Sequence, residues 1–264
     1  MGPEKKRVLT RTRIQEKQMR INPFINMLVV VALFPIGIFA QLGVDIESGL
    51  ISSGYNDARI PGDTGTLFSF SEELESDNEF YYRVRLNYRF GGKHTVSLLI
   101  APLTIHARGF FDKDVIFQEL TFPADTDVDG TYIFNSYRLT YRNDFYQGER
   151  LEFGLGLTAK IRDAEIGLKN AYQETSKVNV GFVPIINFRA FYKMNEHFGF
   201  LLEGDALAAP QGRAEDVLAA LTYRVSDKAL VKFGYRILEG GAGNDEVYTF
   251  SLINYLAFAV SLQF

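Results

Sequence analysis

The chain has 264 residues, of which 47% are hydrophobic and 14% aromatic, with 23 Phe, 14 Tyr and no Trp. Its mean hydropathy of −0.04 is too low for a bundle of membrane-spanning helices, and the absence of cysteine excludes disulfides, thiol catalysis and cysteine-ligated zinc. The formal net charge of −4 argues against nucleic-acid binding, which requires a basic surface.

Residues 1–40 have the parts of a secretory signal. A basic stretch from Lys5 to Arg20 precedes an apolar run from Met27 to Phe39 and the small residue Ala40. The run has 13 residues, fewer than the roughly 20 that a membrane-spanning helix needs, which favours a cleaved signal peptide over an uncleaved anchor. Without this segment the basic residues fall from 28 to 21 and the acidic ones from 32 to 30, so the mature domain, 41–264, carries a net charge of −9.

The mature domain alternates apolar and polar residues with a period of two. In Phe80–Phe90 the apolar residues share one face, and Arg83, Arg85 and Arg89 share the other. Ten segments show this pattern: 42–54, 79–90, 94–108, 131–145, 150–162, 177–194, 197–208, 213–225, 228–239 and 246–264. About eleven tilted residues span a hydrocarbon layer of roughly 25 Å. We therefore predict an all-β, transmembrane, antiparallel up-and-down β-barrel of ten strands.

The connections between these segments alternate in length. Those after the even-numbered strands are short, whereas the first three after odd-numbered strands are long, at 55–78, 109–130 and 163–176. A broken segment at 113–122 could extend a hairpin or hide two further strands. Short periplasmic turns opposite longer outer loops are typical of outer-membrane barrels, so we expect the chain to lie in the cell outer membrane.

His106 is the one candidate for catalysis, because it lies near the outer end of its segment. A histidine beside a carboxylate can act as a general base, and Asp163, Glu165, Asp205 and Glu239 could lie near the same rim. No nucleophile motif such as G-x-S-x-G accompanies it. A paired structural histidine is the favoured interpretation.

The segment Asp125–Gly130 could bind calcium, since Asp125, Asp127 and Asp129 are spaced like the first ligands of a calcium loop. The complete motif also needs a Glu at position 12, where this chain has Ser136. A solvated acidic loop is therefore favoured, and no other cofactor is expected.

The charged register of the strands should face the barrel interior, because charges are expensive in hydrocarbon. We expect the following residues to form a lumen charge cluster: Arg83, Arg85, Arg138, Arg142, Arg162, Arg189, Arg236, Glu203 and Asp205. Glu152 and Asp216 should join them on the inward register. A salt-bridged plug is favoured over a conduit for a small anion, because buried charges are normally paired.

The last segment ends in alternating large apolar residues, including Phe258, Leu262 and the terminal Phe264. This pattern resembles the signal that the outer-membrane assembly machinery recognises, so that machinery and outer-membrane lipid are the expected partners.

Four further segments together resemble an uncharacterised family of Gram-negative outer-membrane barrels: Asn135–Arg142, Lys160–Ile166, Asp205–Asp216 and Glu239–Tyr248. The resemblance implies an outer-membrane barrel and no particular activity.

The function expected from the sequence is a non-enzymatic outer-membrane protein with a structural, surface-interaction or small-solute passage role. One alternative is a hydrolase or acyltransferase that modifies lipid at the rim. Another is a soluble secreted barrel that binds an apolar ligand inside.

Overall fold

The computed structural model describes residues 41–210 and 212–264, which form strands, turns and loops. The predicted signal peptide at 1–40 lies outside the described residues. In the described part, no helix is long and apolar enough to cross a membrane. Its fifteen strands are β1 (Gln41–Arg59), β2 (Phe68–Ser69), β3 (Leu74–Ser76), β4 (Glu79–Phe90), β5 (His94–Ala101), β6 (Thr104–Gly109), β7 (Val115–Phe117), β8 (Leu120–Phe122), β9 (Val128–Gln147), β10 (Leu151–Lys169), β11 (Glu174–Lys193), β12 (Phe198–Ala209), β13 (Gly212–Ser226), β14 (Ala229–Gly243) and β15 (Tyr248–Gln263).

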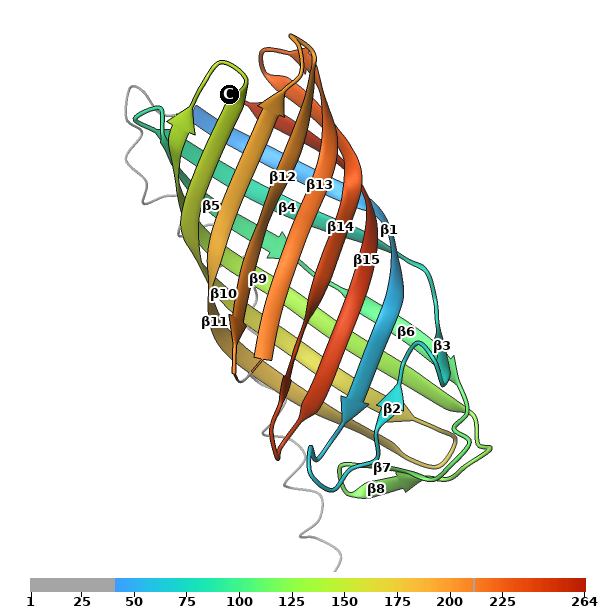
Figure 1. The fold of residues 1–264 in the computed structure, drawn as a ribbon. Coiled ribbons are helices and arrows are strands. Elements are labelled where there is room, and N and C mark those ends of the chain that lie inside the picture. The colour runs from blue at the N-terminus through green and yellow to red at the C-terminus, as the bar shows by residue number, and fades with distance from the viewer. Residues whose placement is uncertain (1–40, 211) are drawn as a thin grey trace, which may run out of the picture. The chain divides into compact units, whose positions relative to one another are not determined.

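Ten strand positions close into one antiparallel ring (Figure 1). The ring runs from β1 through β4, β5 with β6, and β9 to β15, which pairs again with β1 from Gly43–Gln263 to Arg59–Tyr248. β5 and β6 share one position because both pair with β9. The predicted ten-stranded antiparallel barrel is therefore confirmed.

The segment predicted as one strand at 94–108 is divided at Pro102 and Leu103. Proline has no backbone N–H and cannot donate to a sheet ladder. The wall nevertheless stays attached here, because the Leu103 carbonyl accepts the N–H of Phe134 on β9 at 2.9 Å. The division is local, and β6 continues the position that β5 begins.

β10 shows how alternating residues divide between the two faces of the wall. Leu155 and Leu157 are 54% and 68% exposed, whereas Thr158 and Lys160 are buried. On β10 this outward register becomes polar at Asp163, whereas its partner Val180 on β11 is still apolar and 64% exposed. An apolar exterior around a polar interior suits lipid, and it contradicts the alternative of a soluble barrel with its apolar face inside.

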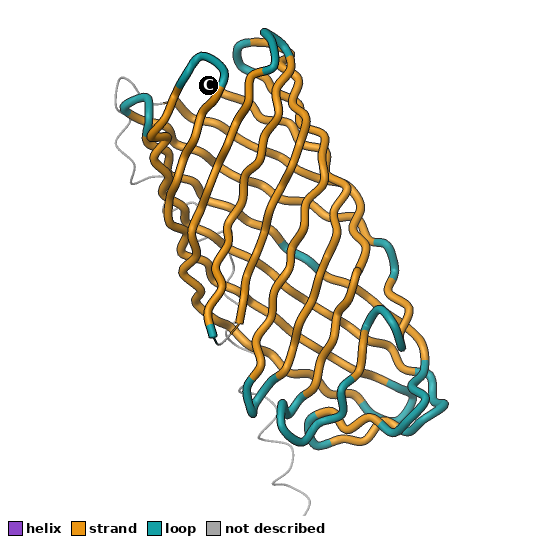
Figure 2. The backbone as a smooth tube through the Cα atoms, in the orientation of Figure 1, coloured by secondary structure: helices purple, strands orange, loops and turns teal. Residues whose placement is uncertain are grey.

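The two ends of the barrel differ (Figure 2). At the terminal end, where the N–H of Phe264 bonds the Leu42 carbonyl at 2.8 Å, short turns join the strands. The β4–β5 turn places Gly91 and Gly92 at φ 57° and 73°, a region that favours glycine. At the other end, called the loop end, the connections after β1 and β6 are long and contain the short strands β2, β3, β7 and β8.

The prediction of a long loop at 163–176 is wrong. β10 continues to Lys169 and β11 begins at Glu174, so the strands fill most of that range. The Asn170 side chain closes the remaining turn by accepting the N–H groups of Tyr172 and Gln173, both at 2.9 Å. The prediction ended the strand where its exterior stopped being apolar, whereas the wall continues beyond that level with polar residues outside.

The two long connections pack together as a hydrophobic cap at the loop end. We define this loop cap by its buried side chains, Phe68, Phe70, Leu74, Phe111, Val115, Phe117 and Phe122. The Phe68 ring centre lies 5.5 to 5.7 Å from those of Phe70, Phe111 and Phe117. The first and second loops therefore share one aromatic core.

The loop cap also contacts the barrel wall. A Cβ on Gly130 of β9 would lie 2.7 Å from the Phe70 ring, so the cap sits directly against that strand. β7 and β8 form a separate hairpin within the broken segment 113–122. In the turn between them, the Gln118 amide donates to the Thr175 hydroxyl of β11 at 3.0 Å. The cap thus spans the mouth of the barrel.

Candidate functional site

Six charged side chains meet in the middle of the barrel, and we call them the central ion cluster. They come from six different strands and are all buried: Glu47 of β1, Arg83 of β4, Arg138 of β9, Asp205 of β12, Asp216 of β13 and Arg236 of β14. Three arginines face three carboxylates, so the cluster is formally neutral. Contacts between opposite walls of the ring leave its centre filled with side chains.

Asp216 is the hub of the central ion cluster. One of its oxygens lies 2.8 Å from a guanidinium nitrogen of Arg83 and 2.6 Å from one of Arg138. Its other oxygen accepts a hydrogen bond from Arg236. A carboxylate that serves three buried arginines joins β4, β9 and β14 to its own strand.

Glu47 and Asp205 complete the pairing. Arg236 donates to both oxygens of Glu47, each at 2.8 Å, in the bidentate geometry that makes such pairs strong. Arg138 lies 2.7 Å from Asp205, which also accepts from Thr158 at 2.6 Å and Asn187 at 2.9 Å. Burial of these ions is tolerable because each carboxylate is both paired and hydrogen-bonded.

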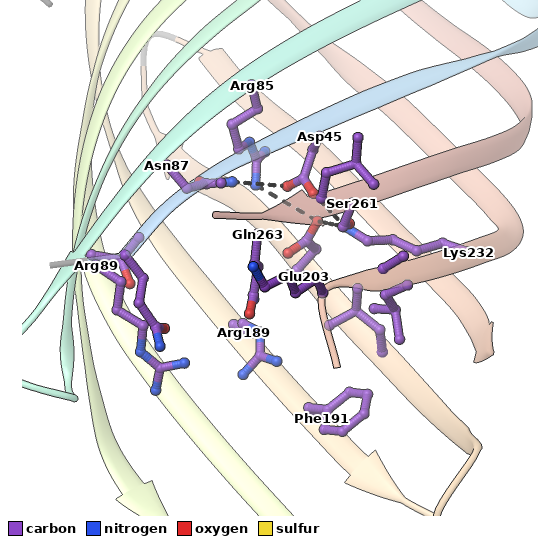
Figure 3. Close-up of a pocket in the computed structure, with 18 of the residues that line it drawn as sticks. Asp45, Arg85, Asn87, Arg89, Arg189, Phe191, Glu203, Lys232, Ser261 and Gln263 are labelled. Atoms are coloured by element: carbon purple, nitrogen blue, oxygen red, sulfur yellow. Dashed lines mark hydrogen bonds and ion pairs between the residues drawn. The ribbon is translucent and has the colours of Figure 1, made fainter. Parts of the chain in front are cut away.

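A chamber of about 310 Å³ opens between the central ion cluster and the terminal end (Figure 3). Glu203 lies 3.6 Å from Arg85 and 3.9 Å from Lys232, which also approaches Asp45 at 3.6 Å. The terminal chamber is therefore lined by charges of both signs. Further pairs in its wall are Arg142 with Asp144 at 2.9 Å and Arg189 with Glu152 at 2.8 Å.

A second chamber, of about 260 Å³, lies toward the loop end and is mostly apolar. Among its lining residues are Lys160, Arg162, Val183, Leu207, Ala209 and Ala214. Beside the central ion cluster, a void lined by Arg83 and Arg138 has only about 10 Å³, room for about one water molecule. The cluster thus separates a polar terminal chamber from an apolar outer chamber.

The nine residues predicted for the lumen charge cluster all line the lumen, but in three separate groups. Arg83, Arg138, Asp205 and Arg236 belong to the central ion cluster. Arg85, Arg142, Arg189 and Glu203 line the terminal chamber, and Arg162 lines the outer chamber. No single cluster holds all nine.

Three acids of the interior were missed by the sequence prediction. Glu47 and Asp45 occupy the inward register of β1, and Asp144 occupies that of β9. The alternation signal could have found the first two, because they alternate with Val44 and Ile46. Asp144 lies near the end of its predicted strand, where alternation alone gives little guidance.

His106 faces outward at the loop end. It is exposed on β6 opposite Thr131 of β9. Among the described residues, no carboxylate is hydrogen-bonded to its imidazole. Asp205, one of the acids considered as its partner, lies buried in the central ion cluster. His106 and Asp205 therefore do not form the suggested pair.

The acidic segment at 125–130 has no converging ligand set. Asp129 is paired with Arg108 at 2.6 Å, and Asp125 adopts a positive φ of 55°. Within residues 41–210 and 212–264, no three His, Cys, Asp or Glu side chains are grouped so that they could hold a metal ion. The Asp125, Asp127 and Asp129 side chains are thus not grouped as the ligands of one calcium ion.

The residues of the predicted assembly signal face outward on β15 and at the chain end. Phe258 and Leu262 are exposed on the lipid-facing register, and Phe264 follows them at the terminal end. Recognition by the assembly machinery stays a prediction for these residues.

No protein-family model matches the sequence, and no curated protein matches it. Several solved structures are similar to the chain. The outer membrane protease OmpT of Escherichia coli has a TM-score of 0.53 at 11% identity, over 85% of this chain and 97% of that one. Ail, the attachment invasion locus protein of Yersinia pestis, gives 0.38 at 11% identity over 86% and 100%.

Neisserial surface protein A gives a TM-score of 0.32 at 12% identity, over 85% of this chain and 97% of that protein. The likeness to OmpT, at 11% identity, concerns the fold and no activity. The closed ring, the apolar exterior and the charged interior agree with it. The chain is a closed ten-stranded antiparallel β-barrel with the fold of a Gram-negative outer-membrane protein.

Proposed function

We propose that this barrel is closed to axial passage and acts as a structural protein of the outer membrane, with the loop cap as its outward face. The observation that carries the proposal is the central ion cluster, in which Asp216 joins three arginines from separate strands across the lumen. An open pore would need this space for water.

The loop cap supports the same proposal from the other side. Its seven core side chains are all at most 1% exposed, and side-chain hydrogen bonds join it to β11 and to the β10–β11 turn. A solute moving along the barrel axis would have to displace both the folded cap and the ion cluster.

Single-channel recording in planar bilayers tests the closed state. The purified chain, shown to be folded by a mobility difference between unboiled and boiled samples, is expected to give no steady openings. The variant Arg138→Ala/Asp205→Ala removes a matched pair of opposite charges from the cluster. Combined with Phe68→Ala/Phe117→Ala, which loosens the loop cap, it should give small openings. Discrete anion-selective openings of the unaltered chain would overturn the proposal.

A second experiment tests the structural role in cells. Loss of the chain should increase uptake of an apolar fluorescent dye across the outer membrane. Expression of a Phe68→Ala/Phe117→Ala variant, which loosens only the loop cap, should restore the barrier. If the variant does not restore the barrier, the barrel wall alone does not provide the structural role and the proposal is wrong.

A further inference from the structure

The barrel wall has a lateral gap between β11 and β12. β11 pairs with β10 along its whole length, as far as Glu174 opposite Lys169. Its pairing with β12 begins only at Ile186, opposite Ala206. In the described part of the chain, residues 174–185 therefore have no strand partner on that side. The β12–β13 hairpin ends nearer the terminal end of the barrel than the β10–β11 hairpin does.

Part of this gap lies at the level of lipid. Phe182 is paired with Ile161, and both face outward within the apolar exterior. Pro184, which lacks an N–H, sits in the unpaired stretch, where a strand edge tolerates proline. Backbone groups cannot face hydrocarbon unsatisfied, and open backbone at this depth is found where it lines a cavity.

The outer chamber lies at this gap. Val183 lines it from β11, Leu207 and Ala209 line it from the end of β12, and Ala214 lines it from β13. These residues come from both sides of the missing pairing. The chamber is therefore bordered on this side by the unpaired edge of β11.

Two cations face this chamber without a carboxylate. Lys160 is only 3% exposed, and its ammonium lies 4.7 Å from the centre of the Phe134 ring. Arg162 donates to the Asn179 side chain, and its Nε is buried without a hydrogen bond. No described acid lies within 4.0 Å of either charged group, unlike the arginines of the central ion cluster.

The acid in the chamber lining is already engaged. Glu239 accepts from Arg213 at 2.7 and 2.9 Å and also from the Tyr55 hydroxyl. It does not neutralise Lys160 or Arg162. A buried charge normally has a partner, so the chamber lacks an anion.

From these observations we propose that the outer chamber binds a single-chain acidic amphiphile, a carboxylate or phosphate head on an apolar chain, taken sideways from the outer leaflet through the β11–β12 gap. Lys160 and Arg162 hold the head group, and the apolar walls hold the chain. A volume of about 260 Å³ is near the lower end of ligand pockets, which suits one chain and not a many-chained lipid. The outer chamber lies inside the barrel, between the central ion cluster and the loop end, and binding there from the side does not require axial passage.

Binding of laurate labelled with ¹³C at its carboxyl, followed by NMR on the full barrel in a neutral detergent, tests the head-group site. Lys160→Met should weaken binding about ten- to a hundredfold, as expected for a lost charge-assisted hydrogen bond. Lys169→Met, on the same strand but exposed at the loop end, is the matched control and should leave binding unchanged. Dodecanol and acetate should both compete poorly.

Equal binding of laurate to the Lys160→Met and unaltered chains would overturn the proposal, as would competition by dodecanol as strong as by laurate. Dodecyl phosphate should compete with laurate, and inorganic phosphate at the same concentration should not. Equal competition by the two would also overturn the proposal, because the site would then recognise a free anion and not an amphiphile.

The gap itself is tested by a cross-link, which is clean because the chain has no native cysteine. In Val183→Cys/Ala209→Cys, a bis-methanethiosulfonate cross-linker, which forms a disulfide with each thiol and releases sulfinate, should block laurate binding, and reduction of those disulfides should restore it. Ala214→Phe, which fills the chamber from β13, provides a second block that needs no cross-link. Both variants should keep the mobility difference of a folded barrel. Unchanged laurate binding by the bridged barrel would overturn lateral access, and unchanged binding by the filled barrel would overturn the chamber as the binding site.

Discussion

Asp216 shows how much of the barrel interior depends on one side chain. It is buried beside Arg83, Arg138 and Arg236, and its removal would leave three guanidinium groups short of a partner. Breaking a buried ion pair is costly because the remaining charge stays desolvated. The inward register predicted this residue, whereas its role as a hub depends on contacts across the ring that alternation along one strand cannot show.

The variant Asp216→Asn should lower the free energy of unfolding by about 3–5 kcal/mol. It keeps the shape of the side chain but loses the negative charge that three arginines share. Urea unfolding in detergent micelles, followed by the mobility difference of unboiled samples, measures the change. Asp227→Asn, in an exposed turn at the terminal end, should alter the free energy little. A similarly small loss of unfolding free energy in both variants would contradict the role of Asp216 as the hub of the central ion cluster.

Lys160 is expected to behave in the opposite way. Its ammonium contacts an aromatic ring and has no carboxylate within 4.0 Å among the described residues. Lys160→Met keeps a long side chain and removes an unpaired buried charge, so stability in ligand-free detergent should stay equal or rise. The same urea titration checks this. A loss of several kcal/mol, comparable to that of Asp216→Asn, would mean that Lys160 is paired after all.

At the scale of elements, alternation predicted the strands well because nearly every outward residue in the lipid layer is apolar. It failed at 163–176, where β10 and β11 rise above the lipid and their exterior turns polar. It also could not predict the loop cap, whose apolar residues follow no period and are buried by contacts between two distant loops. The lateral gap depends on relative strand lengths, which the sequence boundaries did not resolve.

The loop cap should come apart separately from the barrel. Phe68→Ala removes a fully buried ring at the centre of the cap, and the expected loss of about 3–5 kcal/mol falls on the loops that pack against it. Limited proteolysis should then cleave within 60–78 or 110–127, while unboiled samples still run as a folded barrel.

Phe110→Ala is the matched control for this substitution, since Phe110 is exposed beside the same cap. It should leave the protease resistance of both loops unchanged. Cleavage that is equally fast in the two variants, or a barrel that loses its compact gel mobility with Phe68→Ala, would show that the cap is not a separate packing unit.

At the scale of the whole molecule, the two ends of the barrel should face opposite compartments. The β10–β11 turn lies at the loop end and the β13–β14 turn at the terminal end. Because the native chain has no cysteine, single substitutions report each side cleanly. Tyr172→Cys should react with an impermeant maleimide on intact cells, and Asp227→Cys should react only after the outer membrane is opened. The reverse labelling pattern would mean that the barrel has the opposite orientation in the membrane.

The most direct test of the membrane-barrel structure is the gel mobility of the native chain after cell fractionation. Apolar residues cover the exterior, with Phe80 83% exposed, so the folded chain requires lipid or detergent around it. We expect it in the outer-membrane fraction, where the detergent-extracted sample should run faster unboiled than boiled. Recovery from the soluble periplasmic fraction, with the same mobility before and after boiling, would contradict the structure described.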